Sequence, residues 1–306
     1  MAVLVTGGCG FIGSHIVDQL AEKNVDVVIL DNLSSGSKEN IKADDFPVYV
    51  MDLLDPRIEE IFRHHSIHTI IHQAAQASVP QSIRSPYEDG AVNIGGTIRL
   101  VELAKKYEAK KMVFASSSAV YGTPLFLPIP SDHAANPLSP YGLSKLTAEK
   151  YLQLAALLYE IPSTILRYAN VYGPRQNAAG EGGVTAIFAK AFVCGTAPII
   201  FGDGHQTRDF IFVEDVARAN LAALENGTGE VLNVSTGVET SINELFERMQ
   251  TIQSSSLKPI YLAERQGDIK RSVLCNKKTK TVLQWTPHTS LEEGLAKTLE
   301  YYQRRK

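Results

Sequence analysis

The sequence predicts an α/β protein with a doubly wound parallel sheet and a smaller second domain of mixed α/β structure. Three observations support this prediction. The chain opens with an apolar strand, a glycine-rich turn and a helix. Short apolar runs then alternate with helical patterns as far as residue 167, and beyond it the pattern becomes irregular and rich in Gly and Pro. Such alternation is typical of parallel sheets with helices on both faces.

The elements of the first half follow one another in a regular order. The first strand covers residues 1–5, and a helix follows from Gly13 with Ile16, Val17 and Leu20 on one stripe. Five further strands are expected at residues 25–30, 47–50, 69–72, 111–115 and 163–167, and two long helices at residues 92–107 and 141–159.

The second half departs from this order. A helix is expected at residues 184–194, after a stretch rich in Gly and Pro. A strand near 207–213 and a helix at 214–225 look like a return to the sheet region, so the domains are expected to interleave. We predict a dinucleotide-binding domain of residues 1–167 and about 207–230, and a substrate domain of residues 168–206 and 231–306 with helices at 242–253 and 291–305.

Composition and charge argue against several classes of partner. The 306 residues are 44% hydrophobic and carry 30 basic against 33 acidic side chains, which gives a formal charge of -3. This balance provides no electrostatic footprint for nucleic acid or an anionic membrane. Because the sequence shows no charged leader and no run of membrane-spanning length, we expect a cytoplasmic protein.

Cysteine and histidine usage argues against a metal site. The three cysteines are odd in number and far apart, which predicts free thiols in a reducing compartment. His64, His65 and His68 share their spacing with no carboxylate or cysteine partner, so we interpret them as a solvated helix end. We expect no metal.

A glycine fingerprint is the first functional signal. Gly7, Gly10 and Gly13 lie between the first strand and its helix, where backbone N–H groups can approach a pyrophosphate. Asp31 ends the second strand, eighteen residues after Gly13. A carboxylate there accepts ribose hydroxyls and repels a 2′-phosphate, so the sequence predicts NAD in a Rossmann-like domain.

A tyrosine and a lysine supply the second signal. Tyr141 and Lys145 are four residues apart at a helix start, so they lie on one face. An ammonium beside a phenol favours the phenolate, which makes Tyr141 a usable base near neutral pH. The YxxxK pattern also occurs by chance, but here it follows Asn136-Pro137-Leu138-Ser139-Pro140 and a serine-rich strand end.

Further segments complete a resemblance to a known family. They are Asp31 to Gly36, Phe114 to Gly122, Leu166 to Arg175, and Gly202 to Phe210. With them the chain resembles the extended short-chain dehydrogenase/reductases of the NAD-dependent epimerase/dehydratase family, and among these the UDP-glucose 4-epimerases. The match runs from residue 1 to about residue 275.

The resemblance implies a catalytic triad of Ser117, Tyr141 and Lys145, with Ser116 and Ser118 as alternative serines. Tyr141 would take the proton of the sugar 4-hydroxyl, Ser117 would bond that oxygen, and Lys145 would hold the nicotinamide ribose. Hydride would pass from C4 to tightly bound NAD and return to the other face of a transient 4-keto sugar.

The residues after Ser117 narrow the reaction further. Related dehydratases and decarboxylases carry carboxylates at this point, whereas this chain has Ser118-Ala119. Without a second acid or base to divert the keto intermediate, the resemblance favours epimerisation.

The implied cofactor site surrounds the glycine fingerprint. Asp52 and Leu53 would meet the adenine edge, and small residues after the fourth strand would leave room for the cofactor. The predicted NAD-binding residues are Gly7, Gly10, Phe11, Ile12, Gly13, Asp31, Asn32, Ser35, Gly36, Asp52, Leu53, Gln73, Ala74, Ala75, Asn93, Ser116, Tyr141, Lys145, Tyr168 and Val171.

The implied nucleotide-sugar site lies further along the chain. Arg208 and Arg265 match phosphate-binding arginines, whose guanidinium forks suit phosphate oxygens. Ser272 replaces a bulky Tyr of epimerases restricted to unacetylated sugars, which predicts a pocket open to N-acetylated sugars. The predicted residues are Ser117, Tyr141, Asn170, Gly183, Val184, Ile199, Phe201, Arg208, Arg265, Asp268 and Ser272.

Alternatives to a UDP-hexose 4-epimerase stay open. They are a UDP-glucuronate 4-epimerase, another NAD-dependent sugar-nucleotide oxidoreductase and, much less favoured because the triad is complete, a noncatalytic NAD-binding protein. The resemblance also implies a homodimer that pairs the helices at 92–107 and 141–159. Leu146, Ala155, Leu157 and Leu158 are candidates for its interface.

Overall fold

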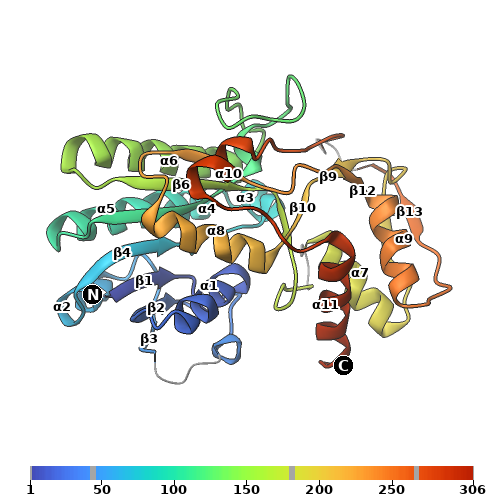
Figure 1. The fold of residues 1–306 in the computed structure, drawn as a ribbon, viewed down its shortest axis with the longest axis horizontal. Coiled ribbons are helices and arrows are strands. Elements are labelled where there is room, and N and C mark those ends of the chain that lie inside the picture. Colours follow the sequence, from blue (N-terminus) through green and yellow to red (C-terminus); the bar gives the residue numbers. More distant parts are fainter. Residues whose placement is uncertain (1, 42–45, 179–182, 265–268, 306) are drawn as a thin grey trace.

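A seven-stranded parallel sheet forms the larger part of the molecule (Figure 1). The structure is a computed structural model that describes residues 2–41, 46–178, 183–264 and 269–305. The strand order is β11-β6-β5-β4-β1-β2-β3, and every neighbouring pair is parallel. The strands are Ala2–Thr6 (β1), Val27–Asp31 (β2), Val48–Val50 (β3), Ile67–His72 (β4), Lys111–Ser117 (β5), Ser163–Tyr168 (β6) and Val231–Val234 (β11).

Helices bury both faces of this sheet. In β1, Ala2 and Leu4 enter a core with α2, α5 and α6, whereas Val3 and Val5 enter a core with α1 and α8. Successive residues of a strand point to opposite faces, so each strand contributes to two cores. The predicted doubly wound α/β class is confirmed. The helices are Phe11–Glu22 (α1), Glu59–His64 (α2), Gly96–Lys106 (α5), Pro140–Tyr159 (α6) and Val213–Glu225 (α8).

The strand order determines where a ligand can bind. β1 lies between β2, which follows it in the chain, and β4, which belongs to the other half of the sheet. Open parallel sheets bind ligands beyond the carboxyl ends of their strands, at the point where the strand order reverses. Gly7 and Gln73, which follow β1 and β4 directly, lie at this point.

The helix expected at residues 92–107 is interrupted. α4 covers Pro86–Gly90, a π-helical segment covers Ala91–Gly95, and α5 begins only at Gly96. Apolar periodicity does not reveal such a segment. The wide turn adds one residue to the helix, but the kinds of residue present stay those of an ordinary helix. π-helical turns are frequent at functional sites, and this one carries the buried Asn93.

Three two-stranded sheets form a second region, with α7, α9 and α11 grouped on the right in Figure 1. Its core is aromatic, with Phe188 and Phe192 packed against Phe246. The paired strands are Phe210–Phe212 (β10) with Asn170–Tyr172 (β7), Thr240–Ser241 (β12) with Thr207–Arg208 (β9), and Ile260–Leu262 (β13) with Ile199–Phe201 (β8). The helices are Val184–Cys194 (α7), Ile242–Ile252 (α9) and Leu291–Gln303 (α11).

The strand expected at 207–213 does not return to the large sheet, so this expectation is wrong. The segment divides into β9 and β10, which belong to two small sheets. The division falls at Asp209, a buried carboxylate that accepts N–H bonds from Thr236, Gly237 and Leu274. The chain bends there because a buried charge needs these partners. The following helix, α8, packs against α1.

The predicted division into two domains stays a prediction. β11 nevertheless pairs with β6 as the edge strand of the large sheet. The sheet therefore takes residues 231–234 from the stretch that we assigned to the substrate domain.

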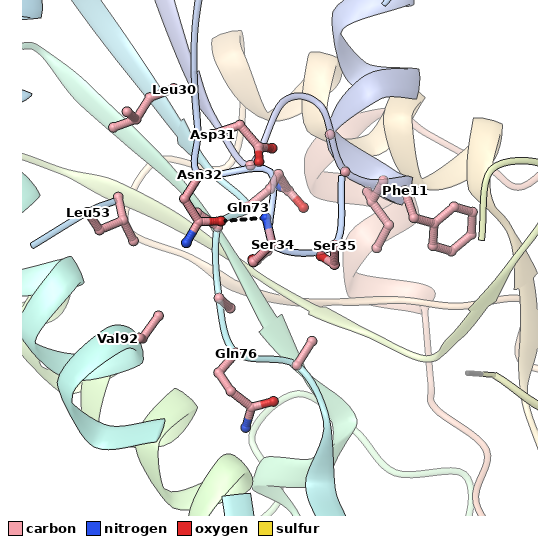
Figure 2. A pocket seen from close by; sticks show the side chains of 18 of the residues that line it. Phe11, Leu30, Asp31, Asn32, Ser34, Ser35, Leu53, Gln73, Gln76 and Val92 are labelled. Atoms are coloured by element: carbon pink, nitrogen blue, oxygen red, sulfur yellow. Dashed lines mark hydrogen bonds between the residues drawn. The ribbon is translucent and has the colours of Figure 1, made fainter. Parts of the chain in front are cut away.

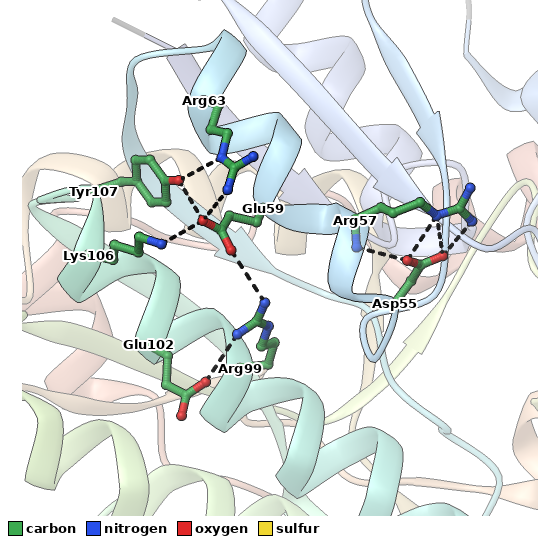
Figure 3. A network of polar contacts seen from close by, with 8 residues as sticks. All are labelled: Asp55, Arg57, Glu59, Arg63, Arg99, Glu102, Lys106 and Tyr107. Carbon is green, nitrogen blue, oxygen red and sulfur yellow. Dashed lines mark hydrogen bonds and ion pairs between the residues drawn. The ribbon is translucent and has the colours of Figure 1, made fainter.

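A charged cluster on the surface connects α2 to α5 (Figure 3). Glu59 accepts hydrogen bonds from Arg63, Lys106 and Tyr107, and Arg99 lies 3.8 Å away. These bonds, above all the one from Lys106, lower the pKa of Glu59 to about 2. Exposed pairs of this kind contribute little to stability, so the cluster supports the scaffold without forming a site.

Two further findings concern the state of the cysteines and the length and polarity of the helices. Cys9, Cys194 and Cys275 are free thiols. Across the described residues, the helices are too short or too polar to cross a membrane. The cytoplasmic location stays a prediction.

Candidate active site

A cavity of about 470 Å³ opens at the carboxyl ends of β1, β2 and β4. Figure 2 shows Asp31 and Asn32 at the end of β2, with Gln73 and Gln76 on the segment that follows β4. Val92 of the π-helical segment closes another side of the cavity. This is the place that the strand order indicates for a ligand.

Two glycines of the fingerprint leave no room for a side chain. Gly7 has a φ of 68°, and a Cβ there would lie 2.7 Å from the backbone nitrogen of Ala74. A Cβ on Gly13 would lie 2.0 Å from the carbonyl oxygen of Gly7. α1 begins at Phe11, within the fingerprint, without a side-chain cap and without an acidic residue in its first turn. Its N–H groups and positive dipole end therefore fit the pyrophosphate of NAD.

Asp31 has the position and contacts of a ribose ligand. The side chain is buried, and its oxygens accept the N–H groups of Cys9 at 2.9 Å and Leu33 at 2.7 Å. Each carboxylate oxygen has two lone pairs, so both retain capacity for ribose hydroxyls. Asn32 donates to Asp52 at 2.9 Å and thus connects the ends of β2 and β3. These residues fit NAD better than a cofactor with a 2′-phosphate.

One part of the cavity wall is formed by Tyr141, which has Ser117 close by, and by Lys145. Tyr141 and Lys145 line it from the first turns of α6, a helix capped by the Ser139 hydroxyl. The Lys145 ammonium is buried and donates to the carbonyl oxygen of Ala115 at 2.8 Å. Ser117 ends β5 and lies close enough to Tyr141 for its side chain to lower the pKa of the tyrosine hydroxyl. This arrangement can transfer a proton to or from a substrate hydroxyl.

Burial acts on both ionisable groups of this pair. It raises the pKa of Tyr141, and the hydrogen bond from Ser117 counteracts this rise. It lowers the pKa of Lys145 to about 8, although Asp89 and Glu149 favour the ammonium. The pKa of Lys145 therefore lies close to neutral pH. A positive nicotinamide ring nearby would favour the Tyr141 phenolate.

The three serines at the end of β5 have different surroundings. The Ser116 hydroxyl is buried and donates to the carboxylate of Glu149. Ser118 already begins a 3-10 turn, whose first N–H bond goes to the Ser117 hydroxyl. Ser117 is the one serine of the three that acts on the pKa of Tyr141, so its position favours it as the serine of the triad.

A buried ion pair holds α6 against the sheet. Glu149, one turn beyond Lys145, accepts bonds from Arg167 Nε at 2.9 Å and Nη2 at 2.6 Å. Arg167 belongs to β6, and its guanidinium lies 4.7 Å from the centre of the Tyr121 ring. The Glu149 side chain is 1% exposed and the Arg167 side chain is 7% exposed. With Ser116 bound to the same carboxylate, the pair joins α6, β5 and β6.

The cavity contains all but three of the predicted NAD-binding residues. Gly36 packs against the backbone of Cys9 in the fingerprint loop. Asn93 lies behind the wall, bonded to the backbone of Gln76, and Val171 packs against the core beside α1 and α8. The contacts of all these residues with NAD stay predictions.

Sequence reasoning missed part of the cavity wall. Some of these residues neighbour a predicted motif, so extending each motif by one residue would have found them. Gln81 and Glu88 have no such signal because they come from α3 (Val79–Arg84) and α4, which the sequence analysis did not resolve. The missed residues are Leu30, Ser34, Met51, Gln76, Ala77, Gln81, Glu88, Val92 and Ala115.

The predicted nucleotide-sugar residues, apart from Ser117 and Tyr141, lie in the second region. Arg208 on β9 donates from Nη1 to the carbonyl oxygens of Thr207 and Ile269. Phe201 lines a separate hollow of about 310 Å³. Gly183 precedes α7, whose N-terminus has no side-chain cap, and Val184 begins that helix. Asn170 lies on β7, Ile199 on β8 and Ser272 after β13, whereas Arg265 and Asp268 lie outside the described residues.

The histidines near α2 do not line the cavity at the carboxyl ends of the strands. His64 ends α2 and is exposed, as is His68, whereas His65 bonds to the Tyr49 hydroxyl at 2.9 Å. Among the described residues, no three His, Cys, Asp or Glu side chains gather as a metal site would require.

Comparison with known proteins shows the family of the chain. The model of the NAD dependent epimerase/dehydratase family matches residues 3–235. A putative UDP-glucose 4-epimerase of Methanocaldococcus jannaschii is 48% identical over 300 residues, which cover 98% of this chain and 97% of that protein.

Solved structures agree with this match. A UDP-glucose 4-epimerase of Thermotoga maritima, solved with UDP-glucose, superimposes with a TM-score of 0.97 at 44% identity and covers 100% of this chain and 99% of its own. A UDP-N-acetylglucosamine 4-epimerase of Methanobrevibacter ruminantium, in complex with UDP-N-acetylmuramic acid, gives 0.95 at 37% identity, with 100% and 99% covered.

Proposed function

The chain belongs to the NAD dependent epimerase/dehydratase family, and we propose that it interconverts UDP-hexoses at C4, with UDP-glucose and UDP-galactose as its first substrate pair. The observation that carries this proposal is that Tyr141 and Lys145 line a cavity that fits NAD, with Ser117 close to Tyr141. Relatives named UDP-glucose 4-epimerase support the choice of substrate.

The proposed mechanism assigns one role to each residue of the triad. Tyr141, as phenolate, takes the proton of the sugar 4-hydroxyl and later returns it to the oxygen at C4. Ser117 bonds to the same oxygen and keeps it beside Tyr141. Lys145 binds the nicotinamide ribose and stabilises the phenolate by its charge. Bound NAD supplies the acceptor and donor of the C4 hydride, so the reaction has no net oxidation.

The cofactor residues hold NAD between turnovers. Gly7, Gly10 and the start of α1 would bind the pyrophosphate, and Asp31 would bind the adenosine ribose. The 4-keto sugar has to present its other face before reduction, so the sugar must turn while NAD stays in place. Residues Ser118 and Ala119 offer no carboxylate that would divert this intermediate into elimination or decarboxylation.

A panel of UDP-sugars tests the proposal. Purified protein with its bound NAD is incubated with UDP-glucose, UDP-galactose, UDP-N-acetylglucosamine and UDP-glucuronate, and each C4 epimer pair is separated by chromatography. We expect epimers of the hexoses without release of NADH. Stoichiometric NADH that accumulates with substrate contradicts the proposal and favours a net oxidoreductase.

Tyr141→Phe separates a catalyst from a noncatalytic NAD-binding protein. The ring stays, but the group that carries the proton is lost, so we expect turnover to fall by roughly 10²–10⁴-fold. The NAD content after purification should equal that of the unchanged protein. Residual turnover near the wild-type level would exclude Tyr141 as the base.

Ser272 supports a second substrate pair, UDP-N-acetylglucosamine and UDP-N-acetylgalactosamine. Serine leaves space beside the C2 substituent where a tyrosine would fill it, and one structural relative is a UDP-N-acetylglucosamine 4-epimerase. We expect Ser272→Tyr to lower activity on acetylated sugars selectively, and Ser272→Ala to keep it. An unchanged ratio of acetylated to plain activity in Ser272→Tyr would show that residue 272 does not set this specificity.

The proposal includes a homodimer built on α6. Leu154, Leu157 and Leu158 are 47%, 81% and 60% exposed, and Tyr87 on neighbouring α4 is 89% exposed. Such an apolar surface is typical of a protein interface. Ala155, a candidate from the sequence, is buried in the core instead, and Leu146 packs beside Tyr121 and Ile129.

Light scattering during gel filtration tests the dimer. Leu154→Glu combined with Leu158→Glu places two charges on this surface, so we expect monomers. Val238→Glu is the matched control, because Val238 is also exposed but lies in the second region. A double variant that stays dimeric would move the interface elsewhere.

A further inference from the structure

A buried carboxylate next to the catalytic pair is not explained by the triad. Asp89 lies on α4 and is 1% exposed. Its Oδ1 accepts bonds from Gln76 Nε2 at 2.8 Å and from Asn93 Nδ2 at 3.2 Å. Its Oδ2 has no hydrogen-bond partner in the described part of the chain. Burying a carboxylate oxygen in this way is unfavourable, so the position calls for a role.

The partners of Asp89 connect three segments of the site. Gln76 lines the cavity, and its N–H donates to Asn93 Oδ1 at 2.9 Å. Asn93, in the π-helical segment, donates to the Ser144 hydroxyl at 3.0 Å. That hydroxyl donates to the carbonyl oxygen of Tyr141 at 3.0 Å. An unbroken series of hydrogen bonds therefore runs from Asp89 to the backbone of the proposed base.

We propose that Asp89 is a positioning residue for the reaction: it holds Gln76 and Asn93 in one arrangement, and its negative charge acts on the Tyr141 and Lys145 pair. The proposal rests on the function proposed above. An asparagine at this position could accept the same bonds at Oδ1 without burying a charge. What aspartate adds to that geometry is therefore its charge.

The charge acts on both members of the pair in the same direction. The carboxylate of Asp89 raises the pKa of Tyr141 and the pKa of Lys145. It thereby keeps Lys145 an ammonium, which binds ribose hydroxyls, and delays ionisation of Tyr141 until a positive nicotinamide ring is close. A base that ionises only beside the loaded cofactor fits a reaction in which proton and hydride transfer are coupled.

Few other charges face Asp89 from the neighbouring elements. α6 contributes Glu149, which also raises the pKa of Lys145. α3 contributes Arg84, which donates to Gln81. Glu88 and Tyr87 on α4 are both exposed. Residues 73–78 and the π-helical segment have no charged side chain.

Two variants separate the charge of Asp89 from its hydrogen bonds. Asp89→Asn removes the charge and keeps the acceptor, whereas Asp89→Ala removes both. Glu102→Gln is the matched control, because it removes an exposed carboxylate from neighbouring α5. The first measurement is a pH titration of tyrosinate absorbance in NAD-loaded protein, taken as the difference from the same background carrying Tyr141→Phe. The second is the pH dependence of kcat on the best UDP-sugar.

We expect Asp89→Asn to shift the titration of Tyr141 to lower pH by about one unit. Both limbs of its kcat profile should shift the same way, because Lys145 also loses its proton at lower pH. Asp89→Ala should show this shift and, because Gln76 and Asn93 are released, about a tenfold lower kcat at its own optimum with a smaller change in KM. Glu102→Gln should match the unchanged protein.

An unshifted tyrosinate titration in Asp89→Asn overturns the role of the charge. A normal kcat in Asp89→Ala overturns the role in positioning. If Asp89→Ala does not fold, Gln76→Ala tests the role in positioning, because it removes the donor of the bond from Gln76 to Asp89. Asp89→Asn still tests the role of the charge. The titration needs no sugar, so it decides on Asp89 even if every UDP-sugar fails and the proposed function falls.

Discussion

The catalytic helix and the predicted sugar-nucleotide residues are held by different kinds of contact. α6 is joined to the large sheet by side chains that are buried together: Lys145 bonds to β5, and Glu149 bonds to Arg167 of β6. The strands of the second region have two or three residues, and Arg208 there donates to backbone carbonyls. Buried side-chain bonds thus hold α6 to the large sheet, whereas the second region combines short strands, the backbone contacts of Arg208 and the buried Asp209 carboxylate.

This difference suits the proposed reaction. The proton and hydride positions have to stay fixed within a fraction of an ångström, because misplaced groups lose much of their catalytic effect. The sugar, in contrast, has to turn between two orientations. A region of short strands can accommodate that movement more easily than a seven-stranded sheet buried on both faces.

Breaking the buried ion pair should have the largest effect on stability. Glu149→Gln leaves Arg167 buried without its charged partner, so we expect the free energy of unfolding to fall by about 3–5 kcal/mol. Denaturant titration followed by circular dichroism measures the change. Glu244→Gln, which removes the partner of Arg248 in an exposed pair of α9, should cost under about 1 kcal/mol. Equal losses in the two variants would remove the contrast between the two regions.

His72 should make the large sheet sensitive to acid. Burial, helped by the charge of Lys145, lowers its pKa to about 3 from an ordinary value of 6.5. The unfolded chain therefore binds a proton below pH 6.5 that the folded chain refuses, and the free energy of unfolding falls as the pH falls. For this group alone we expect about 2 kcal/mol between pH 7 and pH 5.

Denaturant titrations at several pH values measure this effect. His72→Gln should show a shallower fall, because glutamine does not titrate and can still bond to Thr6 and Thr97. Identical slopes for the two proteins would place the acid sensitivity in other groups.

Arg208 should affect substrate binding without affecting the chemical step. Arg208→Gln removes a cation that we assign to the diphosphate, so we expect KM to rise by about tenfold with kcat within about twofold. Lys258→Gln, in the exposed loop before β13, is the control for a lost positive charge. Steady-state kinetics on the best UDP-sugar distinguishes the two. A large fall in kcat would mean that the substrate region also positions the reacting atoms.

The smallest effect is expected at the surface cluster around Glu59. Its lowered pKa means that the carboxylate stabilises the fold above about pH 4.5, and that this contribution disappears as the pH falls towards 2. At neutral pH, Glu59→Gln should lower the melting temperature slightly, and added salt should reduce the difference. Differential scanning calorimetry at low and high salt measures it. A loss as large as that of Glu149→Gln would contradict the distinction between buried and exposed pairs.

The sequence predicts the large sheet well because its signals are local. Apolar runs mark strands, and the glycines between β1 and α1 mark a turn that no side chain fits. The contacts that complete the site have no such signal. Glu149 meets Arg167 eighteen residues further along, and Asp89 meets Gln76 thirteen residues before it. The local pattern of neither stretch marks these pairs, because each contact depends on how a helix packs against the segment beside it.

The second region was harder to predict for the same physical reason. Strands as short as β9 and β12 cannot show a period, and the bend at Asp209 depends on N–H groups from residues 236, 237 and 274. Aromatic residues such as Phe210 and Phe212 favour a strand locally. Which sheet that strand joins is decided by distant parts of the chain.

The π-helical segment also constrains how the chain can change over evolution. Each residue advances a helix by about 100°, so deleting one residue from Ala91–Gly95 would rotate every later side chain of α5 by that angle. Leu100 and Leu103 would then leave the core, and Glu102 and Lys105 would take buried positions. The wide turn can therefore be lost only together with a new apolar pattern along α5. Such a loss needs several substitutions at once, so we expect the turn to be kept as the sequence changes.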